Sequence, residues 1–289
     1  MSNLNAPESA AEKILPVLTP ENYYSVESNI AYVSSSQYKD FVGTTGKMGC
    51  EAAALARMHG ELAEEKTTAL MVGSYVDAHF EGTLPTFIAQ NPEIISSRGA
   101  TAGQLKAEYK QAELMIQRAE RDDTFMRYMK GDKQVIMTGE IEGVPVKIKI
   151  DSFDEVRITD LKTVRSIAET FYAKDLNQRL NFCEWWGYDI QGAFYREVVR
   201  QNTGKLLPFY ICAISKDKTG TVCHPRIKVI EVPPIKMDEK LIEIKSQIRK
   251  IQDLKDGVYD PIRCEICDYC ADTEVLDGPI SMDMLMGEI

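Results

Sequence analysis

The feature that most constrains the fold is a β-rich stretch in the middle of the chain, residues 134–164. Polar and apolar residues alternate along 134–150, and a second run rich in β-branched residues follows at 156–164. Alternation with a period of two is typical of half-buried strands, and the polar turn at 152–155 predicts that the two runs form a hairpin. The chain must therefore contain a sheet, whatever its other segments form.

The segments on both sides of this hairpin carry helical patterns. Capping residues, apolar periodicity and terminal glycines predict helices at 34–41, 50–59, 67–80, 101–130, 166–202 with a break near Asn177, and 237–255. A second hairpin is expected over 206–215 and 221–232. This order of segments indicates a mixed α/β domain around a small sheet.

The length of 289 residues is enough for one large domain or two small ones. We interpret residues 1–30 as an irregular N-terminal arm, 31–278 as a single domain and 279–289 as a Met-rich tail. The tail is either a disordered terminus or a contact for a partner or a second subunit.

The charge balance argues against a protein that coats nucleic acid. The chain has 44 acidic and 34 basic residues and a net charge of −10, which leaves room only for a local basic groove. No apolar run approaches the roughly 18 residues of a membrane-spanning helix, and residues 1–11 lack the pattern of a signal peptide. We therefore expect a cytoplasmic protein with no membrane partner.

The predicted hairpin places two carboxylates and a lysine at one edge of the sheet. Asp160 and Lys162 are two residues apart and so point to the same face, and the turn brings Asp151 close to them. Two carboxylates can hold hard divalent cations, and a nearby lysine can orient a water or stabilise phosphate charge. The D-x-K spacing alone also fits an edge hairpin with surface charges, and it recurs at 238–240 and 253–255.

A predicted helix over 181–200 carries Tyr188, Gln191 and Tyr195 on one face, because they are spaced i, i+3 and i+7. Taken alone, such a stripe fits aromatic core packing with one hydrogen-bonded amide. The stripe follows the carboxylate-rich hairpin in the chain, so the two features occur together in this order.

This combination resembles the PD-(D/E)XK nuclease superfamily over roughly residues 34–270, and is most similar to RecE-like and YqaJ-like phage exonucleases and AddB/RecB-type nuclease domains. The stretch YDIQGAFY at 188–195 is especially RecE-like. The segment Gly73-Ser74-Tyr75-Val76-Asp77 resembles the Gly-x-x-x-His segment of the family, with Asp77 in place of the histidine. His79, two residues later, would face elsewhere as a partly buried neutral histidine.

The resemblance implies a restriction-endonuclease-like core, with helices flanking a central mixed sheet, and dependence on Mg²⁺ or Mn²⁺. The catalytic residues that it implies are Asp151, Asp160, Lys162, Gln191 and Tyr195, and the implied metal ligands are Asp77, Asp151, Asp160 and the main-chain carbonyl of Leu161. Lys162 would position the attacking water, Gln191 would orient Lys162 or contact the substrate backbone, and Tyr195 would support it. Arg165, Lys147 and Lys149 are either phosphate contacts or ordinary surface charges.

The activity implied is hydrolysis of duplex DNA from an end by a phage- or prophage-encoded recombination enzyme in a bacterial host cell. A single-strand annealing protein would be its partner, and a homo-oligomeric ring would reconcile an acidic exterior with a basic channel. One alternative is a structure-specific endonuclease of the same superfamily. Another is a non-catalytic DNA-binding or assembly protein on the same fold, against which the intact Asp151, Asp160 and Lys162 argue.

Three of the seven cysteines form the cluster Cys264-x-x-Cys267-x-x-Cys270. This is metal-binding spacing, but a closed site needs four ligands. In AddB-type and CRISPR adaptation nucleases, one cysteine upstream of the core joins three near the C-terminus around a [4Fe–4S] cluster, and by this resemblance Cys50 is the fourth ligand. Zinc and a reduced state without metal are the alternatives. The remaining three, Cys183, Cys212 and Cys223, are expected to be inert core thiols.

Overall fold

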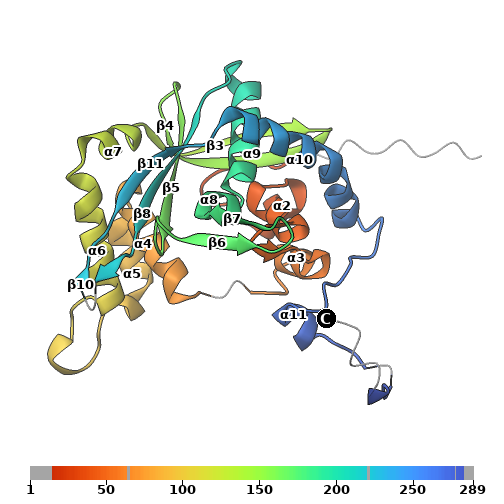
Figure 1. Ribbon diagram of the computed structural model, residues 1–289, viewed down its shortest axis with the longest axis horizontal. Coiled ribbons are helices and arrows are strands. Elements are labelled where there is room, and N and C mark those ends of the chain that lie inside the picture. The colour runs from red at the N-terminus through yellow and green to blue at the C-terminus, as the bar shows by residue number, and fades with distance from the viewer. Residues whose placement is uncertain (1–14, 64–65, 220–221, 277, 283–289) are drawn as a thin grey trace, which may run out of the picture.

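The computed structural model describes residues 15–63, 66–219, 222–276 and 278–282 (Figure 1). At its centre is a five-stranded sheet with the strand order β11-β8-β5-β4-β3. Its strands are β3 (Asp132–Ile141), β4 (Val144–Phe153), β5 (Ile158–Val164), β8 (Phe209–Ser215) and β11 (Ile227–Glu231). Strands β5 and β8 are parallel, whereas the other neighbouring pairs are antiparallel. The predicted central mixed sheet is confirmed.

Helices cover both faces of this sheet, so the predicted flanking helices are also confirmed (Figure 1). Those on one face are α2 (Ser35–Val42), α9 (Tyr188–Thr203) and α10 (Pro234–Lys255), and those on the other are α4 (Thr68–Glu81), α6 (Ala107–Glu120) and α7 (Asp123–Tyr128). Val146 and Ile148 of β4 pack in the first core, whereas Leu161 of β5 and Cys212 of β8 pack in the second. Alternation of side chains along the strands thus supplies two cores.

The remaining elements are short. They are α1 (Val26–Ala31), β1 (Gly43–Thr44), β2 (Lys47–Met48), α3 (Glu51–Met58), α5 (Leu84–Gln90), two 3-10 turns (Pro92–Ile94 and Gly99–Thr101), β6 (Thr170–Ala173), β7 (Gln178–Asn181), α8 (Phe182–Trp185), β9 (Lys218–Thr219), β10 (Val222–Cys223) and α11 (Asp268–Asp272). Three of these strand pairs form separate antiparallel hairpins, β1–β2, β6–β7 and β9–β10.

Several predicted segments differ from the structure. Helix α1 begins within the arm predicted to be irregular, and the strand predicted over 221–232 is broken into β10 and β11. The run 134–150 is two strands, because Glu142 and Gly143 adopt φ angles of 49° and 70° and turn the chain. The single helix predicted over 101–130 is broken, because the Asp122 side chain accepts the Phe125 N–H at 3.0 Å and starts α7. The first part of 166–202 is the β6–β7 hairpin rather than a helix.

A buried lysine holds the N-terminal arm, described from residue 15, against the sheet. Lys147 is 1% exposed, and its Nζ donates to Ser28 Oγ at 3.0 Å, to Asn29 Oδ1 at 2.8 Å and to the Tyr23 carbonyl. Burial lowers the pKa of Lys147 to about 8. Lys147 is therefore neither a phosphate contact nor a surface charge, because the arm covers the polar face of β4.

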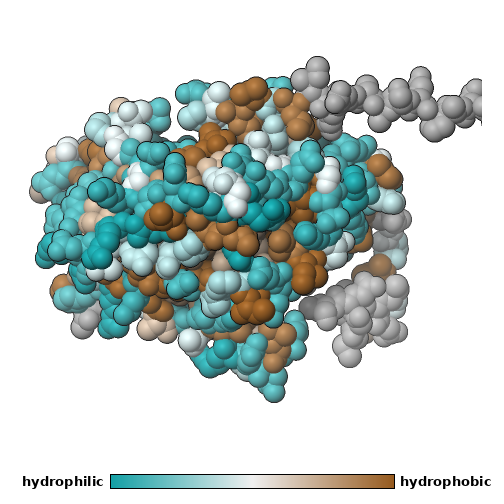
Figure 2. All heavy atoms as spheres, turned by 90° about the horizontal axis from the view of Figure 1, so that it is seen from above, coloured by the Kyte–Doolittle hydropathy of each residue, from teal (hydrophilic) through white to brown (hydrophobic). Residues whose placement is uncertain are grey.

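The visible surface of the molecule is largely hydrophilic. In Figure 2 hydrophilic residues cover most of the visible face, and hydrophobic residues are scattered among them in small groups. Within the described ranges, no helix combines the length and the apolar character needed to cross a membrane. Only residues 279–282 of the predicted Met-rich tail are described, and 283–289 lie outside the described residues.

Candidate active site

The candidate site lies where two neighbouring strands separate. Strands β4 and β5 pair only through Ser152 and Phe153 of β4, beside the turn that joins them. Beyond these pairs β5 continues alongside β8, with Asp160 opposite Ile211. Asp151 and Asp160 stand at the first positions after the strands diverge. The fork therefore exposes two carboxylates from adjacent strands to a common space.

A cavity of about 410 Å³ opens at this fork. It is lined by all the residues predicted to act in catalysis or to bind the catalytic metal, namely Asp77, Asp151, Asp160, Leu161, Lys162, Gln191 and Tyr195. Its other lining residues are Tyr23, Tyr24, Ser34, Ser35, Ser36, Lys39, Lys149 and Tyr188. His79 does not line it, and its Nε2 lies 2.8 Å from Glu120 Oε1 on the outside of α4. The structure thus gathers residues from α2, α4, β4, β5 and α9.

Hydrogen bonds fix the orientation of the two fork carboxylates. Asp160 Oδ1 accepts from Gln191 Nε2 at 2.6 Å, and Asp160 Oδ2 lies 2.6 Å from Lys162 Nζ. Asp151 Oδ2 accepts the backbone N–H of Leu161 at 2.7 Å. The glutamine of α9 therefore orients Asp160 directly, whereas the sequence predicted that it would orient Lys162 or contact the substrate. Leu161 contributes its N–H to the site, and the predicted role of its carbonyl as a metal ligand stays a prediction.

Tyr195 supports the same site through the backbone of β4. Its hydroxyl donates to the backbone carbonyl of Lys149 at 2.8 Å, so it holds β4 two residues before Asp151. The ammonium of Lys149 lies 4.5 Å from the centre of the Tyr24 ring, and both residues line the cavity. Lys149 therefore remains a candidate phosphate contact, whereas the Arg165 side chain is 87% exposed and does not line this cavity.

The carboxylates are crowded and short of positive charge. Burial, and then the charge of Asp160, raise the pKa of Asp151 to about 7. Burial and the Asp151 charge raise the pKa of Asp77 well above its usual value. Burial lowers the pKa of Lys162, but the charge of Asp160 outweighs it, and the net shift is upward. One buried and two half-buried carboxylates with one firmly charged lysine fit the oxygen-rich site that a hard divalent cation requires.

A second lysine, not predicted from any sequence motif, faces the same cavity. Lys39 comes from α2, and its Nζ lies 5.7 Å from the centre of the Tyr188 ring. Lys162 Nζ lies 5.3 Å from the centre of that ring. Burial, and then the charge of Lys162, lower the pKa of Lys39 to about 8. The two ammonium groups and the ring form one wall of the site, and only the packing of α2 against α9 brings them together.

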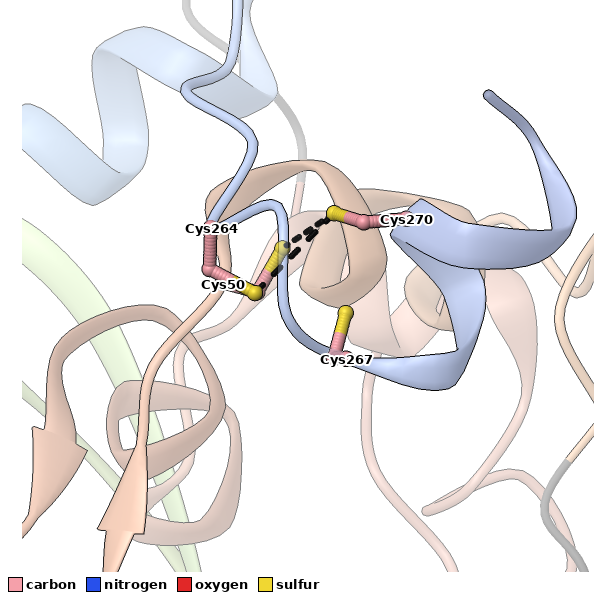
Figure 3. Close-up of side chains that lie close together, drawn as sticks. All are labelled: Cys50, Cys264, Cys267 and Cys270. Atoms are coloured by element: carbon pink, nitrogen blue, oxygen red, sulfur yellow. Dashed lines mark hydrogen bonds between the residues drawn. The ribbon is translucent and has the colours of Figure 1, made fainter. Parts of the chain in front are cut away.

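The four predicted cysteines form a separate cluster (Figure 3). The sulfur atoms of Cys50, Cys264, Cys267 and Cys270 all lie within 4.8 Å of one another. Cys50 precedes α3, whereas the other three lie at and before α11, so the cluster joins segments that are far apart in the sequence. Backbone N–H groups of Ile266 and Cys267 outweigh burial and lower the pKa of Cys264 to about 7. Four sulfur ligands, one of them readily ionised, fit a soft metal or an iron–sulfur cluster.

We expect the carboxylate crowding to weaken the metal-free protein as pH rises. Asp151 has an ordinary pKa of 3.8 and a folded pKa of about 7, so between these values the folded state keeps a proton that the unfolded state has lost. The stability contributed by that proton is fully present below pH 3.8 and is lost as pH rises through 7. Bound Mg²⁺ would relieve the repulsion and should raise the Tm more at pH 8 than at pH 6.

Thermal unfolding at both pH values, with and without Mg²⁺, checks this expectation. The matched variant is Asp151→Asn, which should unfold at a higher temperature than the wild type at pH 8 without Mg²⁺ and should respond less to the ion. Equal Mg²⁺ responses of the two proteins at pH 8 would contradict a cation site at Asp151.

The fork, its oriented carboxylates and the adjoining lysine define a PD-(D/E)XK-type nuclease site. Comparison supports this class. Residues 34–273 match a family described as a PDDEXK-like domain of unknown function (DUF3799), and the chain belongs to that family. A crystal structure of a "putative exonuclease" from Eubacterium rectale is 47% identical, covers 95% of this chain and 100% of its own, and has a TM-score of 0.87. No curated protein matches the chain.

Proposed function

We propose that the protein is a metal-dependent DNA exonuclease that shortens duplex DNA from its ends in phage-type recombination. The observation that carries this proposal is the pairing of Asp151 and Asp160 at the strand fork with Lys162 in contact. The 47% identical neighbour named as an exonuclease supports the choice of an end-dependent mode. The duplex substrate and the role in recombination rest on the resemblance to RecE-like enzymes.

The residues divide the chemistry among them. Asp77, Asp151, Asp160 and the Leu161 carbonyl would hold Mg²⁺ or Mn²⁺, which supplies Lewis-acid stabilisation of charge on the phosphate. Gln191 keeps the Asp160 carboxylate in its orientation. Lys162 remains protonated, so it donates hydrogen bonds and can position the attacking water or neutralise a phosphate oxygen. Lys39 and Lys149 border the cavity and offer further positive charge to the DNA backbone.

For the cysteine cluster we propose a [4Fe–4S] centre, with zinc as the alternative. Within the described residues, its four sulfurs lie apart from the carboxylate cavity, and none of the four cysteines lines it. A structural role follows, because a metal held by four cysteines ties α3 to the C-terminal segment.

We also propose a cellular setting, which rests on the resemblance to RecE-like enzymes and on the net charge. A cytoplasmic enzyme encoded by a phage or prophage would act with a single-strand annealing protein, to which it would supply single-stranded DNA. The net charge of −10 repels DNA from the outer surface, so a ring of subunits with the cavities facing inward would concentrate DNA at the sites.

The test compares the ends of the substrate. With Mg²⁺, we expect linear duplex to shorten progressively while covalently closed circles persist, because an exonuclease requires a free end. The Lys162→Met protein, purified in parallel, controls for contaminating nucleases. Rapid cutting of closed circles by the wild type would favour the endonuclease alternative, and failure to degrade either substrate while binding DNA would favour a non-catalytic protein.

A further inference from the structure

A second cavity lies beside the active site, and we propose that it binds an unpaired nucleobase of the DNA strand that occupies the active site. This inference rests on the proposed function and deepens it. The cavity has a volume of about 340 Å³ and contains Phe171, Phe182, Trp186 and Tyr188, with Arg165 on its wall. We call it the aromatic cavity. Strand β6, helix α8 and the start of α9 supply its rings.

The aromatic cavity adjoins the catalytic one, and a single side chain forms part of the wall of both. Tyr188 lines both cavities. On the catalytic side, Lys162 Nζ lies 5.3 Å and Lys39 Nζ 5.7 Å from the centre of its ring. A nucleotide with its phosphate at these lysines therefore has the aromatic cavity within reach of its own base or the adjacent one.

Trp186 is held in a position that leaves it open to a ligand. Phe171 stacks on Trp185 at 4.9 Å with an angle of 9° between rings, but meets Trp186 edge-on at 6.1 Å and 74°. Trp186 is 42% exposed although it is a large aromatic residue. Gly187 follows with a φ of 63°, and a Cβ there would lie 2.9 Å from Thr44 Cγ2. The left-handed glycine thus separates α8 from α9 and directs Trp186 and Tyr188 to one cavity.

The chemistry of the walls fits a nucleobase better than an apolar peptide side chain. Aromatic rings stack on the flat face of any base, which gives binding without sequence preference. The Arg165 side chain is 87% exposed at the rim, where it can contact a backbone phosphate. Its Nη1 lies 3.6 Å from Glu169 Oε1, also on the cavity wall, and a bound phosphate would replace this partner. Bases in a duplex are already paired and stacked, so the occupant is a base of a single-stranded segment. In Figure 1, β6, β7 and α8 lie together below the sheet.

The experiment measures binding without hydrolysis. A fluorescein-labelled oligothymidylate is titrated with the full-length protein in buffer free of divalent cations, and anisotropy gives the Kd. Trp186→Ala should weaken binding about tenfold, because it removes one stacked base, whereas Trp186→Phe should retain most of the affinity. Tyr259→Ala is the matched control, because Tyr259 is also an exposed aromatic residue, at 55%, and lines neither cavity.

A second series of titrations changes the oligonucleotide instead of the protein. An abasic nucleotide is placed at successive positions of the oligonucleotide, and one position should weaken wild-type binding about tenfold and have little effect on Trp186→Ala. Arg165→Ala, at a fully surface position, should reduce the salt dependence of log Kd by about one phosphate contact. This variant keeps the proposal testable if Trp186→Ala does not fold.

The outcomes separate this inference from the nuclease proposal. Trp186-dependent binding by a protein that never hydrolyses DNA would leave the aromatic cavity supported and the proposed function refuted. Wild-type Kd and wild-type KM for DNA in a folded Trp186→Ala protein that remains an active nuclease would overturn the aromatic cavity alone. The proposal would also be overturned if abasic substitution weakened binding by the wild type and by the Trp186→Ala protein equally at every position.

Discussion

Replacing Asp160 by asparagine is expected to lower Mg²⁺-dependent DNA degradation by roughly 10³-fold or more. Asp160 is 2% exposed and contacts both Gln191 and Lys162, so one substitution removes a cation ligand and the counter-ion of the lysine. Lys162→Met should have an effect of similar size, because it removes the only donor in contact with Asp160 Oδ2 within the described residues. Initial rates on end-labelled linear duplex, with saturating Mg²⁺, measure both.

The chain offers matched controls for these two substitutions in a second D-x-K segment, residues 238–240. Asp238 is 56% exposed and pairs with Arg196, which is 14% exposed, and Lys240 pairs with Glu243 on the surface of α10. Asp238→Asn and Lys240→Met should keep wild-type rates, because neither residue lines the catalytic cavity. If the surface variants lose as much activity as the fork variants, the active site has been placed wrongly.

The two fork variants should differ in stability although both lose activity. Asp160→Asn removes one of the charges that raise the pKa of Asp151, and so relieves repulsion in the metal-free protein. Both substitutions break the ion pair between Asp160 and Lys162. Lys162→Met leaves the carboxylates without their nearest cation, whereas Asp160→Asn leaves Lys162 beside the charge of Asp151, so Lys162→Met should be the less stable variant. If the two variants lose the same activity but differ in Tm, the contribution of Lys162 to stability is separate from its role in catalysis.

The sequence could predict the fork residues because their geometry is local. Asp160 and Lys162 share a face through the two-residue period of a strand, and Gln191 and Tyr195 share one through the helical period. The sequence could not predict that Gln191 would bind Asp160, since that contact depends on how α9 packs over β5. Lys39 was missed for the same reason, because α2 reaches the cavity only through tertiary packing.

The errors also have local causes. Thr170–Ala173 and Gln178–Asn181 have four residues each, too few for strand alternation to outweigh the helical signals that follow them. Lys147 lies at a polar position of a correctly predicted strand, but the N-terminal arm covers that face of β4. Periodicity gives the face on which a side chain lies, whereas the partner that covers the face is decided by segments distant in sequence.

Cys50→Ser is expected to remove the metal from the cysteine cluster and to lower the Tm by on the order of 10 °C, because structural metal ligation contributes several kcal/mol to folding. Cys50 is the only one of the four ligands outside the C-terminal segment, and its Sγ lies 3.6 Å from Cys270 Sγ. Without it, α11 would keep few ties to α3. Two hydrogen bonds join the start of α3 to the segment before α11. The Ala52 N–H donates to the Ile262 carbonyl at 3.2 Å, and the Ile262 N–H donates to Glu51 Oε2 at 2.9 Å.

Metal analysis and unfolding after anaerobic purification test this expectation together. The wild type should be brown and contain about four iron and four sulfide per chain if the centre is [4Fe–4S], or be colourless with about one zinc if it is not. Cys183→Ser is the matched control, because Cys183 lies outside the cluster, and this variant should keep its metal. In Cys50→Ser, protease should cleave the C-terminal segment faster, while activity per folded molecule at low temperature persists, because none of the four cysteines lines the catalytic cavity. A wild type free of iron and zinc, or a Cys50→Ser protein with its metal and Tm unchanged, would refute the four-cysteine centre.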